Sequence, residues 1–405
     1  MTRLLFTSGR IIGRETPWEP GWLLVDGTLI AGVGAGTSPD ARPDGVEVID
    51  AHGLTLLPGF IDLHVHGAMG HETMDGNPDG LLEMSRFYAR HGVTSYLPST
   101  WTASRGATLA ALDAVAQALG SSSDGATILG AHMEGPYLSP DKPGAQDPSL
   151  IRRARRDEAV EFLDRGVVRL LALAPEIPEN GWLIDECVRR GVTVSAGHTN
   201  ARYEDIAQAA SRGLRQVTHL FNAMSALGHR EPGVVGAALS LPELLCELIA
   251  DNVHVHPAAM AIATSAKGRS GVALISDAIR AAGLPEGEFR IDHRTVIHRA
   301  GAVRLRDGTL AGSVLTLDVA LRNLIAATGR PLEQLWPTTS LNAARAIGVD
   351  ARTGSLEVGK QADIVLLDEA LQVAMTVVEG RIVFRRNGGG EARPEEKIPS
   401  PIAVD

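Results

Sequence analysis

Two histidines lie one residue apart in the stretch "FIDLHVHG", residues 60–67. The apolar residues before them are typical of a buried strand, in which successive side chains point to opposite faces. His64 and His66 would therefore point to the same face, where both imidazoles could bind one metal ion. The alternative is that they are two hydrogen-bonded polar residues at a strand end, and the rest of the chain must decide.

Further imidazole and carboxylate groups follow other short apolar runs, each at the point where a strand would end. Such groups, without thiolates, suit zinc, iron, manganese or cobalt. Their repeated position at strand ends predicts a metal centre. The residues concerned are His132 and Glu134, His198, His219, His254 and His256, and Asp277.

Eight such apolar runs alternate with segments of helical periodicity, such as "PDGLLEMSRFYARH", "TLAALDAVAQAL" and "YEDIAQAASRG". This alternation predicts an α/β fold, a (β/α)8 TIM-like barrel over residues 58–354. The carboxyl ends of its strands would meet at one mouth and bring the polar residues together. A doubly wound open sheet is the alternative, but no glycine-rich dinucleotide-binding turn supports it.

The two ends of the chain have a different pattern, in which short alternating strands are separated by turns such as Asp-Gly and Glu-Gly. We expect residues 1–57 and 355–387 to form one small β-sandwich domain. Residues 388–405 are rich in glycine, proline and charge and are expected to form a loose tail.

Composition narrows the class of protein. A net charge of −10 over 405 residues argues against a nucleic-acid partner, and no apolar run is long enough to span a membrane. The two cysteines indicate neither a disulfide framework nor a thiolate zinc site. With no signal-peptide pattern, we expect a cytoplasmic protein that acts on a small molecule.

The stretches "PGFIDLHVHG", "HMEGP", "HLFNAM" followed by "HREPG", and "GTLAGS" occur in this order along the chain. They resemble the amidohydrolase superfamily and, within it, the N-acetylglucosamine-6-phosphate deacetylases. The resemblance extends from residue 58 to about residue 368. It implies hydrolysis of the acetamide of N-acetyl-D-glucosamine 6-phosphate to glucosamine 6-phosphate and acetate.

The resemblance also implies the metal ligands. Glu134, His198 and His219 match the ligands of the principal ion, a divalent transition metal, with zinc expected and iron, manganese or cobalt as alternatives. His64 and His66 match a pair that only some deacetylases keep. Where the pair is kept, a second ion can bind, bridged by Glu134, so that one or two ions are expected per subunit.

Asp277 matches the family's catalytic aspartate, which would accept a proton from metal-activated water and return it to the departing amine. For the substrate, the resemblance implies contacts with Asn222, Ala223, Arg230 and His254. Arg230 and His254 would bind the phosphate, and Arg230 would reach across the interface of a homodimer.

Residue 146 departs from the family pattern, because "KPGAQDP" has Gln146 where a histidine usually contacts the acetyl group. An amide can donate a hydrogen bond but carries no positive charge. A second ion at the His64–His66 pair would supply the missing electrophile, although Gln146 filling loop space remains an alternative. The departure leaves open a related substrate, such as N-acetylgalactosamine 6-phosphate or an N-acyl amino acid. A non-catalytic barrel scaffold is the remaining alternative.

Overall fold

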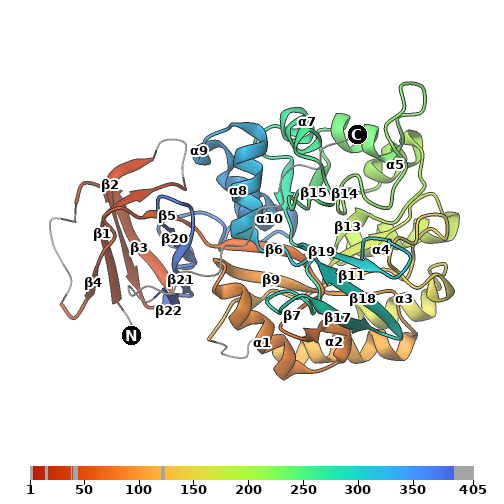
Figure 1. Ribbon diagram of the computed structural model, residues 1–405, viewed down its shortest axis with the longest axis horizontal. Helices are drawn as coiled ribbons and strands as arrows, with labels where there is room; N and C mark the ends of the chain where they lie inside the picture. The colour runs from red at the N-terminus through yellow and green to blue at the C-terminus, as the bar shows by residue number, and fades with distance from the viewer. Residues whose placement is uncertain (1–2, 14–16, 38, 40–43, 120–123, 387–405) are drawn as a thin grey trace.

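The computed structural model describes residues 3–13, 17–37, 39, 44–119 and 124–386. Figure 1 shows two bodies side by side, a β domain built from both ends of the chain and a larger body of strands and helices. The predicted tail, residues 388–405, lies outside the described residues.

The larger body is a barrel of parallel strands, which confirms the predicted fold class. Each neighbouring pair of strands is hydrogen-bonded in chain order, and a parallel bridge between Val65 and Ala278 joins the first strand to the segment after the last. Each of the eight predicted apolar runs contains a strand of the barrel. These strands are β6 (Phe60–Val65), β9 (Val93–Thr100), β11 (Ala131–Glu134), β12 (Val168–Leu173), β13 (Thr193–Ala196), β14 (Leu214–Val217), β15 (Leu245–Leu248) and β16 (Val272–Leu274), with the short β10 (Thr127–Ile128) also paired to β9.

Helices follow most of the barrel strands and cover the outside of the barrel (Figure 1). Their starts have local causes: Asn77 accepts a hydrogen bond from the Asp79 backbone, and Ser104 from that of Ala107. Among the described residues, no helix is both long and apolar enough to cross a bilayer. The helices are α1 (Pro78–Ala89), α2 (Arg105–Ala118), α3 (Arg156–Leu163), α4 (Gly181–Arg189), α5 (Tyr203–Ser211), α6 (Gly233–Ser240), α7 (Pro257–Lys267), α8 (Leu317–Thr328), α9 (Leu332–Leu335) and α10 (Leu341–Ala346).

A small antiparallel sheet lies between β16 and α8, and the sequence did not predict it. It consists of β17 (Gly287–Ile291), β18 (Arg294–Arg299) and β19 (Ala302–Leu305). Its apolar face, including Val296, packs with Trp101 and Ala145 in a separate apolar cluster. The sheet thus rests on residues that follow β9 and β11, and a second short hairpin, β7 (Gly67–Ala68) with β8 (His71–Glu72), follows β6.

The β domain is one hydrogen-bonded sheet whose strands come from both ends of the chain. Strand β20 lies between β5 and β21, and the order is β22-β21-β20-β5-β1-β2-β3, with β4 paired to β1. A bridge between Leu29 and Gln361 brings β3 back toward β20, so the sheet folds over its own apolar core. Its strands are β1 (Arg3–Ile11), β2 (Trp18–Asp26), β3 (Leu29–Ala35), β4 (Glu47–Asp50), β5 (Thr55–Pro58), β20 (Ile364–Leu367), β21 (Val373–Val378) and β22 (Arg381–Arg385).

Candidate active site

Four histidines surround the buried carboxylate of Glu134 at the mouth of the barrel. Glu134 Oε1 lies 3.2 Å from His198 Nε2 and 3.1 Å from His219 Nε2. On the other side, Glu134 Oε2 lies 3.4 Å from His66 Nε2, and Oε1 lies 3.5 Å from His64 Nε2. The structure therefore brings together all five residues that the sequence proposed as metal ligands.

The backbone after three strands has an unusual conformation. His198, His219 and Asp277 have φ values of 46°, 32° and 50°. Residues other than glycine rarely adopt this left-handed conformation, and it is enriched at functional sites because the surrounding structure must hold it. Here it occurs immediately after the barrel strands, where it sets the direction of side chains that contact Glu134 and its neighbours.

In two of these histidines, the hydrogen bond made by Nδ1 shows which ring nitrogen carries the proton. His198 Nδ1 lies 3.0 Å from the carbonyl oxygen of Lys142, which can only accept a hydrogen bond. His64 Nδ1 lies 3.1 Å from Glu247 Oε2. Each Nδ1 is therefore the donor, and in the neutral ring each Nε2 directs a lone pair into the cluster.

These lone pairs make the donor set suitable for cations. The Nε2 atoms of His64 and His198 face carboxylate oxygens within 3.5 Å, which is repulsive unless a metal ion or a proton on Nε2 lies between them. Two groups have ligand atoms within 4.8 Å of one another, and Glu134 belongs to both: His64–His66–Glu134 and Glu134–His198–His219. Nitrogen and oxygen donors in this arrangement fit divalent transition ions.

Where no metal ion is bound, protons on the imidazoles can supply this positive charge. Burial lowers the pKa of His64, but the carboxylates of Asp277 and Glu134 raise it, and the net pKa lies well above its usual value. Burial raises the pKa of Glu134, but His64 and His198 lower it well below its usual range. The cluster therefore favours ionised carboxylates that share positive charge with the imidazoles.

Asp277 lies on the same side of the cluster as the His-x-His pair. Its Oδ1 is 3.2 Å from His66 Nε2 and 3.4 Å from His64 Nε2. The sequence predicted Asp277 at the end of the eighth strand. In the structure β16 ends at Leu274, and Asp277 follows in the segment that closes the barrel. There its backbone N–H donates to the carbonyl oxygen of His64. This backbone bond keeps its carboxylate beside the metal-ligand candidates.

Gln146 is buried and directly contacts the cluster. Its Nε2 donates to Glu134 Oε2 at 2.6 Å, and its Oε1 accepts from the Thr102 backbone N–H at 2.7 Å. Both ends of the amide are therefore satisfied by neighbours at the barrel mouth. The side chain orients Glu134 instead of lying free in its loop.

The proposed substrate contacts lie at different depths around the mouth. Asn222 and Ala223 follow His219, and Ala223 is close to the His198 ring, since a Cβ placed on Gly144 would meet both. Arg230 is exposed on the loop before α6. Within one chain, Arg230 therefore does not contact the metal-ligand candidates.

The prediction that His254 and His256 end the seventh strand was wrong. Strand β15 ends at Leu248, and Asp251 then accepts hydrogen bonds from the backbone N–H groups of Val253 and His254, which turns the chain away from the sheet. His254 Nδ1 also contacts Asp251 Oδ2 at 2.6 Å. Burial lowers the pKa of His254, whereas this hydrogen bond raises it, and the net pKa is above its usual value.

Two histidines near the proposed ligands have other surroundings. His256 is exposed and its ring accepts the Ala258 N–H at the start of α7, so it is a helix cap. His132 is buried below His64 with ring centroids 4.4 Å apart, and its Nδ1 contacts Ser99 Oγ. Burial holds the pKa of His132 well below its usual value, which favours the neutral ring.

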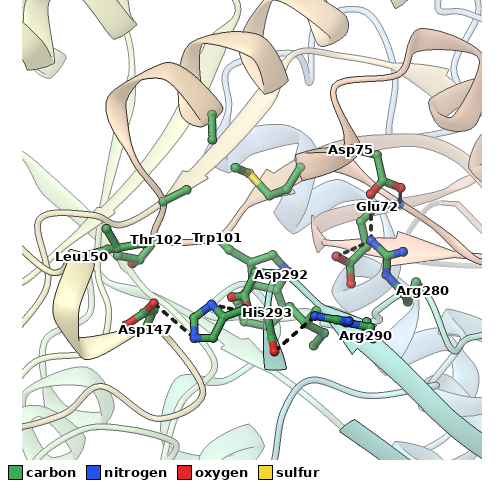
Figure 2. Close-up of a pocket in the computed structure, with 14 residues that line it drawn as sticks. Glu72, Asp75, Trp101, Thr102, Asp147, Leu150, Arg280, Arg290, Asp292 and His293 are labelled. Atoms are coloured by element: carbon green, nitrogen blue, oxygen red, sulfur yellow. Dashed lines mark hydrogen bonds and ion pairs between the residues drawn. The ribbon is translucent and has the colours of Figure 1, made fainter. Parts of the chain in front are cut away.

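The structure contains a cavity of about 410 Å³, whose lining residues are drawn in Figure 2. Trp101 lines this cavity and also stacks on His66, with ring centroids 3.9 Å apart. Arg280, on another wall, pairs with Glu72 and Asp75 at 2.9 and 2.8 Å. None of the metal-ligand candidates lines the cavity, but Trp101 contacts both the cavity and His66.

Sequence reasoning missed Glu247 and Trp101. Glu247 is fully buried within β15, between Cys246 and Leu248, and contacts His64. A carboxylate inside an otherwise apolar strand was an available signal, because such a group is almost never buried without a partner. Trp101 gave no comparable signal, since its stacking on His66 depends on how β6 and β9 are paired.

Known proteins resemble this chain in sequence and in fold. Residues 55–383 match the amidohydrolase family. The chain is 40% identical over 333 residues to the N-acetylglucosamine-6-phosphate deacetylase of Vibrio furnissii, covering 82% of this chain and 83% of the relative. It is 37% identical over 372 residues to the N-acetylgalactosamine-6-phosphate deacetylase of Escherichia coli, covering 90% and 96%.

Solved structures with the same architecture include the N-acetylglucosamine-6-phosphate deacetylase of Pasteurella multocida, with a TM-score of 0.88, 31% identity, and coverage of 94% of this chain and 99% of that one. A mutant of the corresponding deacetylase from Mycobacterium smegmatis, in complex with N-acetyl-D-glucosamine-6-phosphate, has a TM-score of 0.88 at 32% identity and coverage of 95% and 100%.

Proposed function

Because the chain belongs to the amidohydrolase family, we propose that it hydrolyses the acetamide of N-acetyl-D-glucosamine 6-phosphate to glucosamine 6-phosphate and acetate. The observation that carries this proposal is the shared carboxylate of Glu134. It lies between two histidine pairs, with Asp277 3.2 Å from His66 on the same side of the cluster. Named relatives that cover most of the chain supply the substrate class.

Glu134, His198 and His219 would hold the principal divalent ion, for which zinc is proposed. His64 and His66, with Glu134, would hold a second. When bound, such ions act as Lewis acids that make water more nucleophilic near neutral pH and polarise a carbonyl group. The protein fixes the donors, since the backbone positions His198 and His219 and the Nδ1 contacts orient His64 and His198.

Asp277 would act as the general base and then as the general acid. Burial raises the pKa of its carboxyl group, but His64 and His66 lower it below its usual value, which favours the ionised form. It can therefore accept a proton from the attacking water and then return that proton to the nitrogen of the departing amine. One side chain serves as base and then as acid, so no second acid needs to be positioned.

Asn222, the backbone near Ala223, and His254 would bind the sugar phosphate, together with Arg230 from a second subunit. Support for a homodimer comes from the loop before α6, where Arg230 is exposed and the apolar side chain of Leu227 is 58% exposed. An exposed guanidinium suits bidentate phosphate binding once a partner brings the phosphate within reach.

The galactosamine epimer is the second candidate substrate. The specific observation in its favour is the 37% identity to the N-acetylgalactosamine-6-phosphate deacetylase, over 96% of that relative's length. The two sugars differ only in the configuration of one hydroxyl group, so direct competition must separate them.

The test is acetate release from N-acetylglucosamine and N-acetylgalactosamine, each with and without a 6-phosphate, by protein of measured metal content. We expect phosphorylated N-acetylglucosamine to react fastest, activity to vanish on chelation, and zinc to restore it. Full activity in metal-free protein, or no acetate from any of the four sugars, would rule out the proposal.

The phosphate contact has its own variant. Arg230→Ala should raise KM for the 6-phosphate substrate by one to two orders of magnitude, roughly the 1.5–3 kcal/mol of a charge-assisted hydrogen bond. The matched control is Arg155→Ala, since Arg155 is also exposed but forms an ion pair with Asp157, two residues further along the chain. Equal losses on phosphorylated and unphosphorylated sugars would assign Arg230 a structural role only.

A further inference from the structure

Glu247 is a fully buried carboxylate that the proposed reaction does not use. It lies on β15, beside the histidine cluster. Its chain neighbours Cys246 and Leu248 are also fully buried. Burying an unpaired carboxylate is strongly unfavourable, so the hydrogen-bond partners of Glu247 explain why it can be buried.

Three donors surround this carboxylate. Its Oε2 accepts from His64 Nδ1 at 3.1 Å and from the backbone N–H of His219 at 3.3 Å, and its Oε1 accepts from Gln216 Nε2. An ionised carboxylate only accepts hydrogen bonds, which matches three donors and no acceptor. One side chain thus contacts a member of each three-residue group around Glu134.

The two groups are supported unequally. In the Glu134–His198–His219 group, the ring nitrogen of His198 donates to a neutral backbone carbonyl, that of Lys142. In the His64–His66–Glu134 group, the ring nitrogen of His64 donates to a full negative charge. The Nδ1 atoms of His66 and His219 have no hydrogen-bond partner among the described residues. Each group therefore has one imidazole whose Nδ1 donates a hydrogen bond, and only that of His64 donates to a carboxylate.

We propose that Glu247 is a positioning residue for a metal ion held by His64, His66 and Glu134. Its carboxylate keeps the proton of His64 on Nδ1, so that Nε2 always presents its lone pair to the ion, and makes that nitrogen a stronger donor. The contact with the His219 backbone ties the same carboxylate to the neighbouring group. This inference rests on the proposed second ion.

The variant Glu247→Gln tests the charge without changing the shape. Gln216 can reverse its amide to suit the new side chain, because its own Oε1 has no partner. The His64 proton then faces a neutral oxygen. Loss of such a supporting contact lowers metal affinity by about 10–100-fold. We expect zinc titration of metal-free protein to show the weaker of two sites reduced by that factor and the tighter one retained.

The matched control is Asp318→Asn. Asp318 is another buried carboxylate 3.1 Å from a histidine Nδ1, that of His91, and neither residue belongs to the cluster. The variant Asp318→Asn should leave both zinc affinities unchanged. Thermal unfolding of metal-free Glu247→Gln, compared with the parent chain, identifies any general loss of stability.

A double-mutant cycle with His64→Asn shows whether Glu247 acts by positioning His64 or only by packing in the barrel core. If Glu247 acts through His64, adding Glu247→Gln to His64→Asn should leave the affinity of the remaining zinc ion unchanged. An equal further loss in that background, or an unaltered weak site in the single variant, would overturn the inference. The inference would also be overturned if the parent chain bound only one zinc ion. Acetate release by that same sample would then show that the proposed function still stands.

Discussion

At the scale of single residues, the site depends on side chains whose directions are set by the backbone. His198, His219 and Asp277 all adopt left-handed φ values after strand ends. A non-glycine residue in this region carries strain of order 1 kcal/mol or more, which the surrounding barrel must offset. The same backbone that orients these groups therefore makes the mouth less stable than the barrel could otherwise be.

Asp277 offers the clearest residue-level prediction. Asp277→Asn should keep both metal groups intact but lose several orders of magnitude in kcat, because an amide can neither accept nor return the proton. Metal analysis and steady-state kinetics on the same sample check this. Turnover near that of the parent chain would remove Asp277 from the mechanism, and loss of metal would make it a ligand instead.

Gln146 leads to a second prediction. It donates to Glu134, and a neutral amide stabilises a developing negative charge less than a cation does. Replacing His64 and His66 together with asparagine should therefore cripple turnover, and adding Gln146→His should restore part of it. No recovery, with the principal ion still bound, would show that Gln146 only orients Glu134.

Much of this cluster was predictable because ligands of one chemical type recur at strand ends. His64, His66, Glu134, His198 and His219 needed only the barrel pattern to be brought together. The contact of Gln146 with Glu134 was not predictable, since it depends on how the loop after β11 folds back. The turn at Asp251 was also missed. The alternating sequence is typical of a strand, and only the structure shows that the Asp251 side chain accepts hydrogen bonds from the backbone that follows it.

At the scale of elements, the sheet β17–β19 is a separate unit resting on the barrel. Sequence patterns did not reveal it, because four of the five residues of β17 are exposed or only half-buried and the apolar alternation is short. Its small apolar cluster joins Val296 to Trp101, the residue stacked on His66. The stability of the sheet and the position of that ring are therefore linked.

Val296→Ala should loosen this unit. The lost methyl groups and the space left behind cost about 2 kcal/mol, enough to speed amide hydrogen exchange in residues 287–305 about thirtyfold. Thr295→Ala, at the neighbouring half-buried position, is the control and should have little effect. Equal acceleration throughout the barrel strands would show that the sheet does not open independently.

At the scale of the whole molecule, Asp363 joins segments that are far apart in the chain. Its carbonyl accepts from the Gly59 N–H, and its side chain accepts from the Glu379 N–H at 2.9 Å and from Thr353 Oγ1 at 2.7 Å. Burial raises the pKa of Asp363 to about 6, because the hydrogen bonds only partly compensate for lost solvation.

A raised carboxyl pKa means that the folded protein binds the proton more tightly than the unfolded chain. This contribution to stability is fully present below about pH 4 and is lost as the pH rises to about 6. Asp363→Asn stays neutral, so its stability relative to the parent chain should improve by about 2.5 kcal/mol between pH 4 and pH 8. Urea unfolding at both pH values measures this, and a constant difference would contradict it.

The pairing of β20 between β5 and β21 also has a consequence for synthesis on the ribosome. Strands β1 to β5 emerge first, but β20 follows roughly 300 residues later, after the last barrel helix, α10. At translation rates of about 5–20 residues per second, β5 exposes an unpaired edge for roughly 15–60 s. Unpaired edges invite association with other chains. A nascent chain stalled after α10 would thus carry every barrel strand and still lack the strand that covers this edge.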